Sequence, residues 1–171
     1  LLSLERERQA FQVLERPEYA ETYTAAGLTL DLKIDRIDVL DDGGGEVVID
    51  YKTGNSAQSS KWWGDRPEQP QLPLYAVARR GRVEAVTFAL LNVKESGFTG
   101  VAERDGILPG VKASKGEWQP LLDDWQKAVD GLIGAYARGD ARVDPLPQLC
   151  NRCHLASLCR VHESVGLAGL D

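Results

Sequence analysis

The amino-acid sequence predicts an α/β fold of the α+β kind: a mixed β-sheet flanked by helices, with a cysteine segment at its C-terminal end. Three stretches carry this prediction. Apolar and polar residues alternate over residues 28–34, which is the period of a strand. Residues 46–52 have a continuous apolar centre, which is typical of a strand buried on both faces. Residues 117–138 place their large apolar side chains on one helical stripe.

The first half of the chain is predicted to be rich in strands. Residues 1–11 are charge-rich and compatible with a helix, and residues 12–24, interrupted by Pro17, predict short strands or a hairpin. After Ile34 the apolar positions move to the other register, which predicts a β-bulge at Asp35–Arg36. A turn over residues 41–45 leads into the strand over residues 46–52.

The second half is predicted to combine helices and strands. Residues 57–66 predict a loop, 67–80 a helix, 83–93 a strand and 98–103 a further strand. Ser114-x-x-Glu117 is a capping-box pattern before the helix over residues 117–138. Pro145 and Pro147 mark a linker. We therefore expect a core over residues 1–144 and a cysteine-rich segment over residues 145–171 that packs on it.

The composition excludes several classes of protein. The 171 residues are 43% hydrophobic and 27% charged, which are ordinary values for a globular chain. No apolar run is long enough to span a membrane, and no signal-peptide pattern opens the chain. The net charge of −6 argues against a basic protein that coats nucleic acid. Because the chain lacks methionine and begins Leu1-Leu2-Ser3, we expect it to be a fragment of a longer polypeptide.

Two aspartates and a lysine lie where strands are predicted to end. Asp50 and Lys52 are two residues apart on one strand, so their side chains point to the same face, and a hairpin would bring Asp35 beside them. Carboxylates are the ligands that Mg²⁺ prefers, and its remaining positions are open to water and phosphate. Lys52 is suited to orienting a water or stabilising charge on phosphorus. Alternatively, each of these side chains is a solvated strand end.

The predicted helix over residues 67–80 carries two further polar sets. Gln71 and Tyr75 are four residues apart and share one face, so that both can hydrogen-bond a phosphate oxygen or position a water. Alternatively, Tyr75 is a core aromatic and Gln71 a solvated residue. Arg79, Arg80 and Arg82 form a basic cluster that either contacts a phosphate backbone or lies at a solvated helix end.

The predicted loop after the second strand combines basic and aromatic residues. Lys61, Trp62, Trp63 and Arg66 lie within it. Aromatic rings stack on nucleic-acid bases and basic groups contact phosphates, so these residues are candidates for DNA binding. Alternatively, both tryptophans pack on the domain.

The three cysteines lie close together at the C-terminal end. Cys150, Cys153 and Cys159 have a spacing typical of metal ligands, which indicates a metal site in a reducing compartment. Zinc and iron–sulfur clusters usually take four protein ligands. Two alternatives remain. One is a zinc site completed by His154 or His162, and the other is three free buried thiols.

Three blocks of the sequence resemble the PD-(D/E)XK nuclease superfamily in its RecB/AddB-like branch. They are residues 33–38, 48–54 and 71–75, in the order of the family, and the resemblance covers residues 28–76, extended to 160 by the cysteines. It implies a restriction-endonuclease-like sheet and a deoxyribonuclease dependent on Mg²⁺ or Mn²⁺, an exonuclease rather than an endonuclease. It further implies a role in recombination and DNA repair in the bacterial cytoplasm. The implied partners are DNA and a helicase-like region of the same parent chain or of a partner subunit.

The resemblance also implies a role for each polar residue of these blocks. Asp35 and Asp50 would be the metal-binding carboxylates, Lys52 the lysine of the D-x-K element, and Gln71 and Tyr75 the Q-x-x-x-Y pair. Intact Asp35, Asp50 and Lys52 weigh against the alternative function, a catalytically inactive module that binds DNA ends or a partner protein.

A glutamate on the preceding strand often completes such sites in this family. Glu18 is the first candidate here and Glu21 the second. Two features of the family are missing: the glycine before the first aspartate block is replaced by Leu32 or Lys33, and the upstream helix with a metal-facing histidine has no counterpart. The resemblance also implies that Cys150, Cys153 and Cys159 are three of the four ligands of a [4Fe–4S] cluster, the fourth lying outside this chain.

Overall fold

The computed structural model describes residues 1–14, 18–54, 57–92, 96–151 and 153–159. Two compact units make up the chain, Leu1–Ala137 and Arg138–Asp171. Pro17, the strand end predicted at Val93 and the candidate zinc ligand His162 lie outside the described residues.

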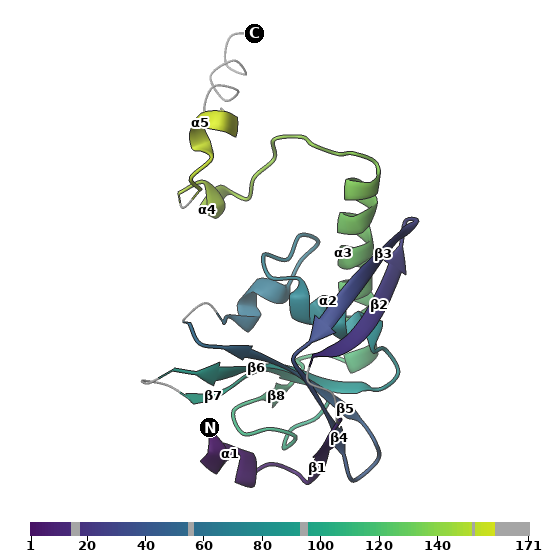
Figure 1. The fold of residues 1–171 in the computed structure, drawn as a ribbon, viewed down its shortest axis with the longest axis vertical. Coiled ribbons are helices and arrows are strands. Elements are labelled where there is room, and N and C mark those ends of the chain that lie inside the picture. Colours follow the sequence, from purple (N-terminus) through teal and green to yellow (C-terminus); the bar gives the residue numbers. More distant parts are fainter. Residues whose placement is uncertain (15–17, 55–56, 93–95, 152, 160–171) are drawn as a thin grey trace. The chain divides into compact units, whose positions relative to one another are not determined.

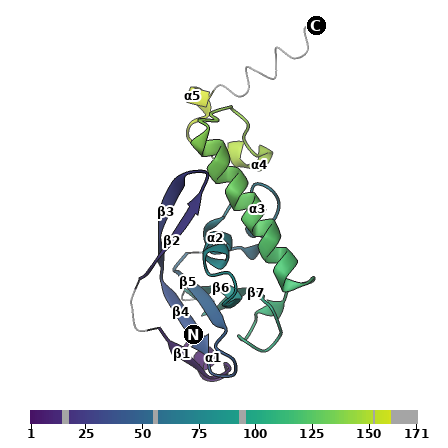
Figure 2. The ribbon, with the colours of Figure 1, turned by 90° about the vertical axis from the view of Figure 1, so that its right-hand side faces the viewer.

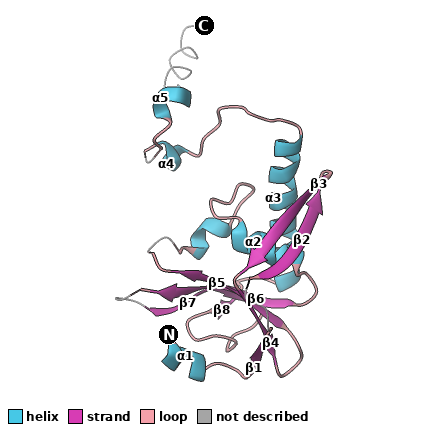
Figure 3. Ribbon diagram, viewed as in Figure 1, coloured by secondary structure: helices cyan, strands magenta, loops and turns pink. Residues whose placement is uncertain are grey.

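The first unit contains a mixed sheet, a separate β-ribbon and two main helices (Figures 1 and 3). The described elements are α1 (Leu2–Arg6), β1 (Phe11–Val13), β2 (Tyr19–Ala25), β3 (Leu28–Ile34), β4 (Arg36–Leu40), β5 (Glu46–Lys52), the 3₁₀ helix η1 (Ser59–Trp62), α2 (Gln71–Ala78), β6 (Val83–Leu91), β7 (Ser96–Ala102), β8 (Lys112–Ala113) and α3 (Trp118–Ala137). The six-stranded sheet has the order β1-β4-β5-β6-β7-β8, and β2 pairs with β3 in the ribbon. The pairs β5–β6 and β7–β8 are parallel, and the other pairs are antiparallel. This arrangement confirms the predicted mixed sheet flanked by helices.

The change of register after Ile34 marks a change of sheet. β3 pairs with β2 in the ribbon, whereas β4 pairs with β1 and β5 in the main sheet. Asp35 lies at the bend between β3 and β4. The predicted bulge is therefore wrong: the side-chain alternation restarts because two strands with different partners meet at this residue.

β5 is the central strand that the sequence predicts. It lies between β4 and β6, and both of its faces are covered. Val48 packs with side chains of α2 and α3, whereas Val47 and Ile49 pack on the other face with residues of the segment between β7 and β8. Figure 2 shows α2 and α3 together on one side of the sheet. The buried centre of β5 thus fixes the position of the polar residues at its end.

α3 follows the predicted amphipathic stripe with two differences. Leu122, Trp125 and Val129 are buried, but Tyr136 at its end is 78% exposed. The helix begins at Trp118, and Ser114 donates its hydroxyl hydrogen bond to the Gly116 carbonyl. Ser114 is therefore not the N-cap, and the predicted capping box is wrong.

The second unit contains two short helices, α4 (Pro147–Cys150) and α5 (Ala156–Cys159). Its first residue is Arg138, a few residues before the proline-marked linker. In the part of the chain that the structure describes, no helix is long and apolar enough to cross a membrane.

Candidate active site

The hairpin of β4 and β5 brings the two aspartates together. Arg36 pairs with Ile49 at the end of the ladder, so Asp35 and Asp50 are opposite neighbours one step further. The Tyr51 backbone N–H donates to Asp35 Oδ2 over 2.9 Å, which fixes the exposed Asp35 carboxylate against the end of β5.

The Asp50 carboxyl group lies in a buried place. It is 1% exposed, and Lys52 Nζ lies 2.6 Å from its Oδ2. Burial raises the pKa of the Asp50 carboxyl, Asp35 raises it further through charge repulsion, and Lys52 opposes the shift. Apart from this ion pair, Oδ2 has no hydrogen-bond partner among the described residues. An ionised Asp50 carboxylate therefore has an electrostatic reason to accept a second cation.

Lys52 connects the carboxylates to α2. Its side chain is 30% exposed, and Nζ donates to Gln71 Oε1 over 3.4 Å. The Gln71 amide donates in turn to the Tyr75 hydroxyl, 3.0 Å away. Tyr75 is buried and donates to the Lys33 carbonyl over 2.6 Å, just before the bend at Asp35. Gln71 and Tyr75 thus share one helical face. Hydrogen bonds and one ion pair connect five of the predicted site residues through β5 and α2, namely Asp35, Asp50, Lys52, Gln71 and Tyr75.

The donor set fits a hard divalent cation with an open coordination sphere. Within the described ranges no group of three or more His, Cys, Asp or Glu side chains is arranged to hold a metal. Asp35 and Asp50 therefore supply two carboxylates only, and the remaining positions are left to water and to phosphate oxygens, as Mg²⁺ often requires. The buried Asp50 Oδ2 supports this fit, because it has no hydrogen-bond partner among the described residues besides its ion pair with Lys52.

An ionic network supports the site from the opposite face of the sheet. Arg36 and Tyr51 alternate with Asp35 and Asp50 along their strands, so they point away from the carboxylates. Arg36 Nε is 2.6 Å from Asp38 Oδ1, and its Nη1 donates to the Tyr51 hydroxyl over 3.0 Å. Arg36 also pairs with Glu5 of α1 over 3.0 Å.

Arg8 completes this network and is itself buried. Its Nη2 is 2.7 Å from Asp38 Oδ2, with both side chains shielded from solvent. Burial would lower the pKa of the Arg36 guanidinium, but hydrogen bonds with Asp38 and Tyr51 raise it. This network was not predicted from the sequence. The available signal was that charged residues occupy the alternate positions of strands that are otherwise apolar.

Neither candidate glutamate joins the two aspartates in a metal-binding group among the described residues. Glu18 is exposed, with Oε2 3.5 Å from Lys33 Nζ, and has a positive φ of 55°. Tyr19 pairs with Ile34 at the end of the β2–β3 ladder, so Glu18 is opposite Asp35 one step further. Among the described residues, however, Glu18 forms no metal-binding group with the two aspartates. Glu21 instead accepts from Arg79 Nη1 over 2.7 Å. The structure therefore does not bring either carboxylate into the Asp35–Asp50 pair.

The basic and aromatic loop divides into buried and exposed members. Trp62 is 0% exposed, with ring centroids 5.1 Å from Phe88 and 6.2 Å from Trp125. Stacking of Trp62 on DNA bases is therefore excluded in this conformation, because the indole belongs to the core. Trp63 is 47% exposed. Lys61 pairs with Glu68 over 3.1 Å.

Arg66 is also exposed, so that it and Trp63 are the accessible members of the loop. Of the basic cluster after α2, Arg79 is buried in ion pairs with Glu46 and Glu21, so it does not contact a phosphate backbone in this conformation.

The cysteines do not form a ligand group in the second unit. Cys150 and Cys159 are partly buried and Cys153 is exposed. The Leu155 N–H donates to Cys153 Sγ over 3.4 Å. With His154 also exposed, no three potential ligands among the described residues converge on one point.

Among the comparisons with known proteins, one gives a family match over most of the chain. The sequence model of the PD-(D/E)XK nuclease superfamily matches residues 2–160. Among curated proteins, none matches the chain significantly. One matching solved structure is titled "Crystal structure of SSO0001", with 13% identity and a TM-score of 0.40. The match covers 86% of this chain and 59% of that one.

Proposed function

The chain belongs to the PD-(D/E)XK nuclease superfamily, and from this premise we propose that it is a deoxyribonuclease dependent on Mg²⁺ or Mn²⁺. The observation that carries the proposal is the placement of Asp35, Asp50 and Lys52 at one end of the β4–β5 hairpin. There the buried Asp50 Oδ2 has Lys52 as its one partner among the described residues. Such a group is suited to a phosphodiester, whose charge it would meet with a cation and an ammonium group.

Each residue of the group has a distinct proposed role. Asp35 and Asp50 would hold the metal ion, which, when bound, supplies Lewis-acid activation of the phosphodiester and of a water molecule. Lys52 would stabilise negative charge on the phosphate oxygens or orient the attacking water, because Asp50 and Gln71 hold its ammonium group in place. Tyr75 would position Gln71, since its own hydroxyl is fixed by the Lys33 carbonyl.

The finer features of the proposal rest on the sequence resemblance. They are exonucleolytic cleavage, a role in recombination and repair in the cytoplasm of a bacterium, and association with a helicase-like region. The proposal of a [4Fe–4S] cluster held by Cys150, Cys153 and Cys159 rests on the same resemblance, which includes the spacing of these cysteines. The described thiols are not arranged as a ligand group, so no step of the reaction is assigned to a cluster, and zinc stays an alternative.

Cleavage by variants of the site tests the proposal. The purified chain is incubated with linear single-stranded and double-stranded DNA in Mg²⁺, in Mn²⁺ and in EDTA. We expect metal-dependent cleavage that Asp50→Ala and Lys52→Ala each reduce by about 100-fold or more, since each removes charge stabilisation at the phosphate. Asp31→Ala is the matched control, because Asp31 is an exposed strand aspartate outside the group.

Two outcomes would contradict the proposal. Cleavage that is unchanged by Asp50→Ala and Lys52→Ala would assign the activity to another site or to a contaminant. DNA binding without cleavage, together with no Mn²⁺ binding by calorimetry, would instead favour the inactive module that binds DNA ends or a partner.

A further inference from the structure

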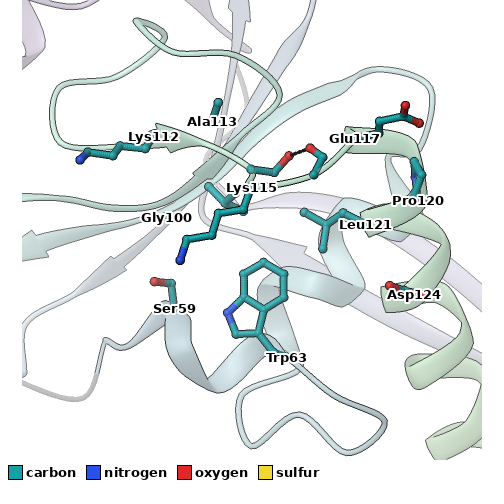
Figure 4. Close-up of a pocket in the computed structure, with 13 residues that line it drawn as sticks. Ser59, Trp63, Gly100, Lys112, Ala113, Lys115, Glu117, Pro120, Leu121 and Asp124 are labelled. Carbon is teal, nitrogen blue, oxygen red and sulfur yellow. Dashed lines mark hydrogen bonds between the residues drawn. The ribbon is translucent and has the colours of Figure 1, made fainter.

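A cavity of about 530 Å³ opens beside the aromatic loop (Figure 4), and neither Asp35 nor Asp50 is among its lining residues. Its walls come from η1 and the residue after it, from β7 and β8, and from the first turns of α3. Its volume is within the range of pockets that hold small organic groups. All of its lining residues belong to the first unit and are described.

Trp63 gives the cavity an aromatic wall. Its indole is 47% exposed and is backed by Trp125, with ring centroids 5.9 Å apart and planes tilted by 38°. Trp63 also lines a neighbouring cavity of about 210 Å³, so that solvent reaches it from more than one side. Pro120 and Leu121 of α3 add apolar surface. The ring is therefore accessible and held in place, which suits stacking by a planar ligand.

The charges around the cavity are separated. Lys112 and Lys115 both line the cavity. Figure 4 shows the Lys115 side chain directed toward Ser59 and Trp63 and the Lys112 side chain directed away from them. Neither lysine forms an ion pair with another residue in the part of the chain that the structure describes. The acidic Glu117 and Asp124 lie at the other end of the view. A ligand with one flat ring and one anionic group matches this distribution.

Packed aromatic side chains connect the cavity to the candidate active site. The η1 segment follows β5 after a short connection, and Trp62 at its end packs on Phe88 with centroids 5.1 Å apart. Lys52 Nζ lies 5.5 Å from the centroid of the same Phe88 ring. Phe88 and Trp62 therefore connect the catalytic strand to the residue that carries the exposed indole.

We infer that this cavity binds one unpaired base of a DNA strand, stacked on Trp63, with the adjacent phosphate at Lys115. The inference rests on the proposed function, since it assigns the substrate of that site a single-stranded segment. Paired bases in a duplex expose only their edges, whereas an unpaired base offers a whole face to an aromatic side chain. Lys115 supplies the contact with the backbone that accompanies such stacking.

Binding of labelled DNA in EDTA tests the inference without cleavage. The ligands are a short oligothymidylate, an abasic strand of the same length and a blunt duplex, measured by fluorescence anisotropy. We expect Trp63→Ala to weaken oligothymidylate binding by about 10-fold, in the range of one lost base stack, and to leave the abasic strand and the duplex unchanged. Lys115→Gln should weaken both single strands and reduce the slope of affinity against salt concentration by about 1.

Two matched variants control for general effects. Tyr136→Ala removes another exposed aromatic from α3 outside the cavity, and Arg6→Gln removes an exposed positive charge from α1. Neither should change binding of the oligothymidylate by more than about twofold, because neither side chain lies at the site.

The outcomes separate this inference from the proposed function. If Trp63→Ala leaves oligothymidylate affinity unchanged, or weakens the abasic strand equally, the base pocket is refuted, even where Asp50-dependent cleavage is observed. If the chain fails to cleave DNA but binds oligothymidylate through Trp63, the proposed function fails and the base pocket stands.

Discussion

Removal of the Arg79 guanidinium is predicted to be among the most destabilising single changes in the first unit. Arg79 lies at the end of α2, is 1% exposed, and donates two hydrogen bonds to Glu46 over 2.8 and 2.5 Å and one to Glu21 over 2.7 Å. The Glu46 side chain is only 7% exposed, so Arg79→Met leaves a buried carboxylate with Arg82 alone, 3.9 Å away.

The magnitude follows from burial. Breaking a buried pair by removing one partner costs about 3–5 kcal/mol. The free energy of unfolding of a domain is typically about 5–15 kcal/mol, so this loss is a large share of it. Glu46 begins β5 and Arg79 ends α2, which are the two elements that carry Lys52 and Gln71. The same change should therefore also weaken cleavage, through loss of alignment between β5 and α2.

Urea unfolding followed by tryptophan fluorescence measures the loss, because Trp62, Trp118 and Trp125 lie in one buried cluster. The matched control is Arg80→Met: Arg80 pairs with Asp123 at the surface, and exposed pairs contribute about 0–1 kcal/mol. If Arg79→Met also costs less than about 1 kcal/mol at an unchanged m-value, the assignment of Arg79 as a buried anchor of the site is refuted.

Two further predictions concern the core and the response to acid. Trp62→Ala should lower the free energy of unfolding by about 3–5 kcal/mol, whereas Trp63→Ala should cost less than about 1 kcal/mol, as urea titration of the two variants would show. Burial alone would raise the pKa of Glu21, but the hydrogen bonds from Arg79 and the Thr22 N–H, together with the positive charges of Arg79 and Arg82, outweigh it and hold that pKa below its usual 4.5. The ionised form is thus favoured by folding, and its contribution is present above pH 4.5 and lost as pH falls through the lower folded value. The stability difference between the wild type and Glu21→Gln should accordingly shrink from about pH 7 to about pH 3, and a difference that stays constant would contradict this assignment.

The parts of the site that depend on local pattern could be predicted from the sequence. A continuous apolar run predicts a central strand, and the i, i+2 rule then places Asp50 and Lys52 on one face. The i, i+4 rule places Gln71 and Tyr75 together on a helix. These relations need no knowledge of distant segments, and the structure contains each of them.

The parts that depend on distant partners could not be predicted. Trp62 and Trp63 are adjacent in a stretch without periodicity, and only the fold determines that one contacts Phe88 while the other is exposed. Arg79 belongs to a basic cluster whose members look equivalent in sequence, yet its partner Glu46 is 33 residues away. The change of sheet at Asp35 likewise depends on which strands pair with β3 and β4, and the register slip alone does not distinguish it from a bulge.

The distribution of charge around the hairpin explains how the fold can hold a destabilising carboxylate. Because burial raises the pKa of Asp50, its ionised form costs the folded state free energy above that pKa, and the protonated form does not. On the opposite face, Arg36 is bound by Asp38, Tyr51 and Glu5, and these bonds fasten β4 and β5 together one residue away from Asp35 and Asp50. The stabilising network and the buried Asp50 carboxylate thus occupy alternate positions of the same two strands. A cation that binds only the folded arrangement would offset the cost of Asp50, so affinity for the metal and stability of the hairpin are linked through one side chain.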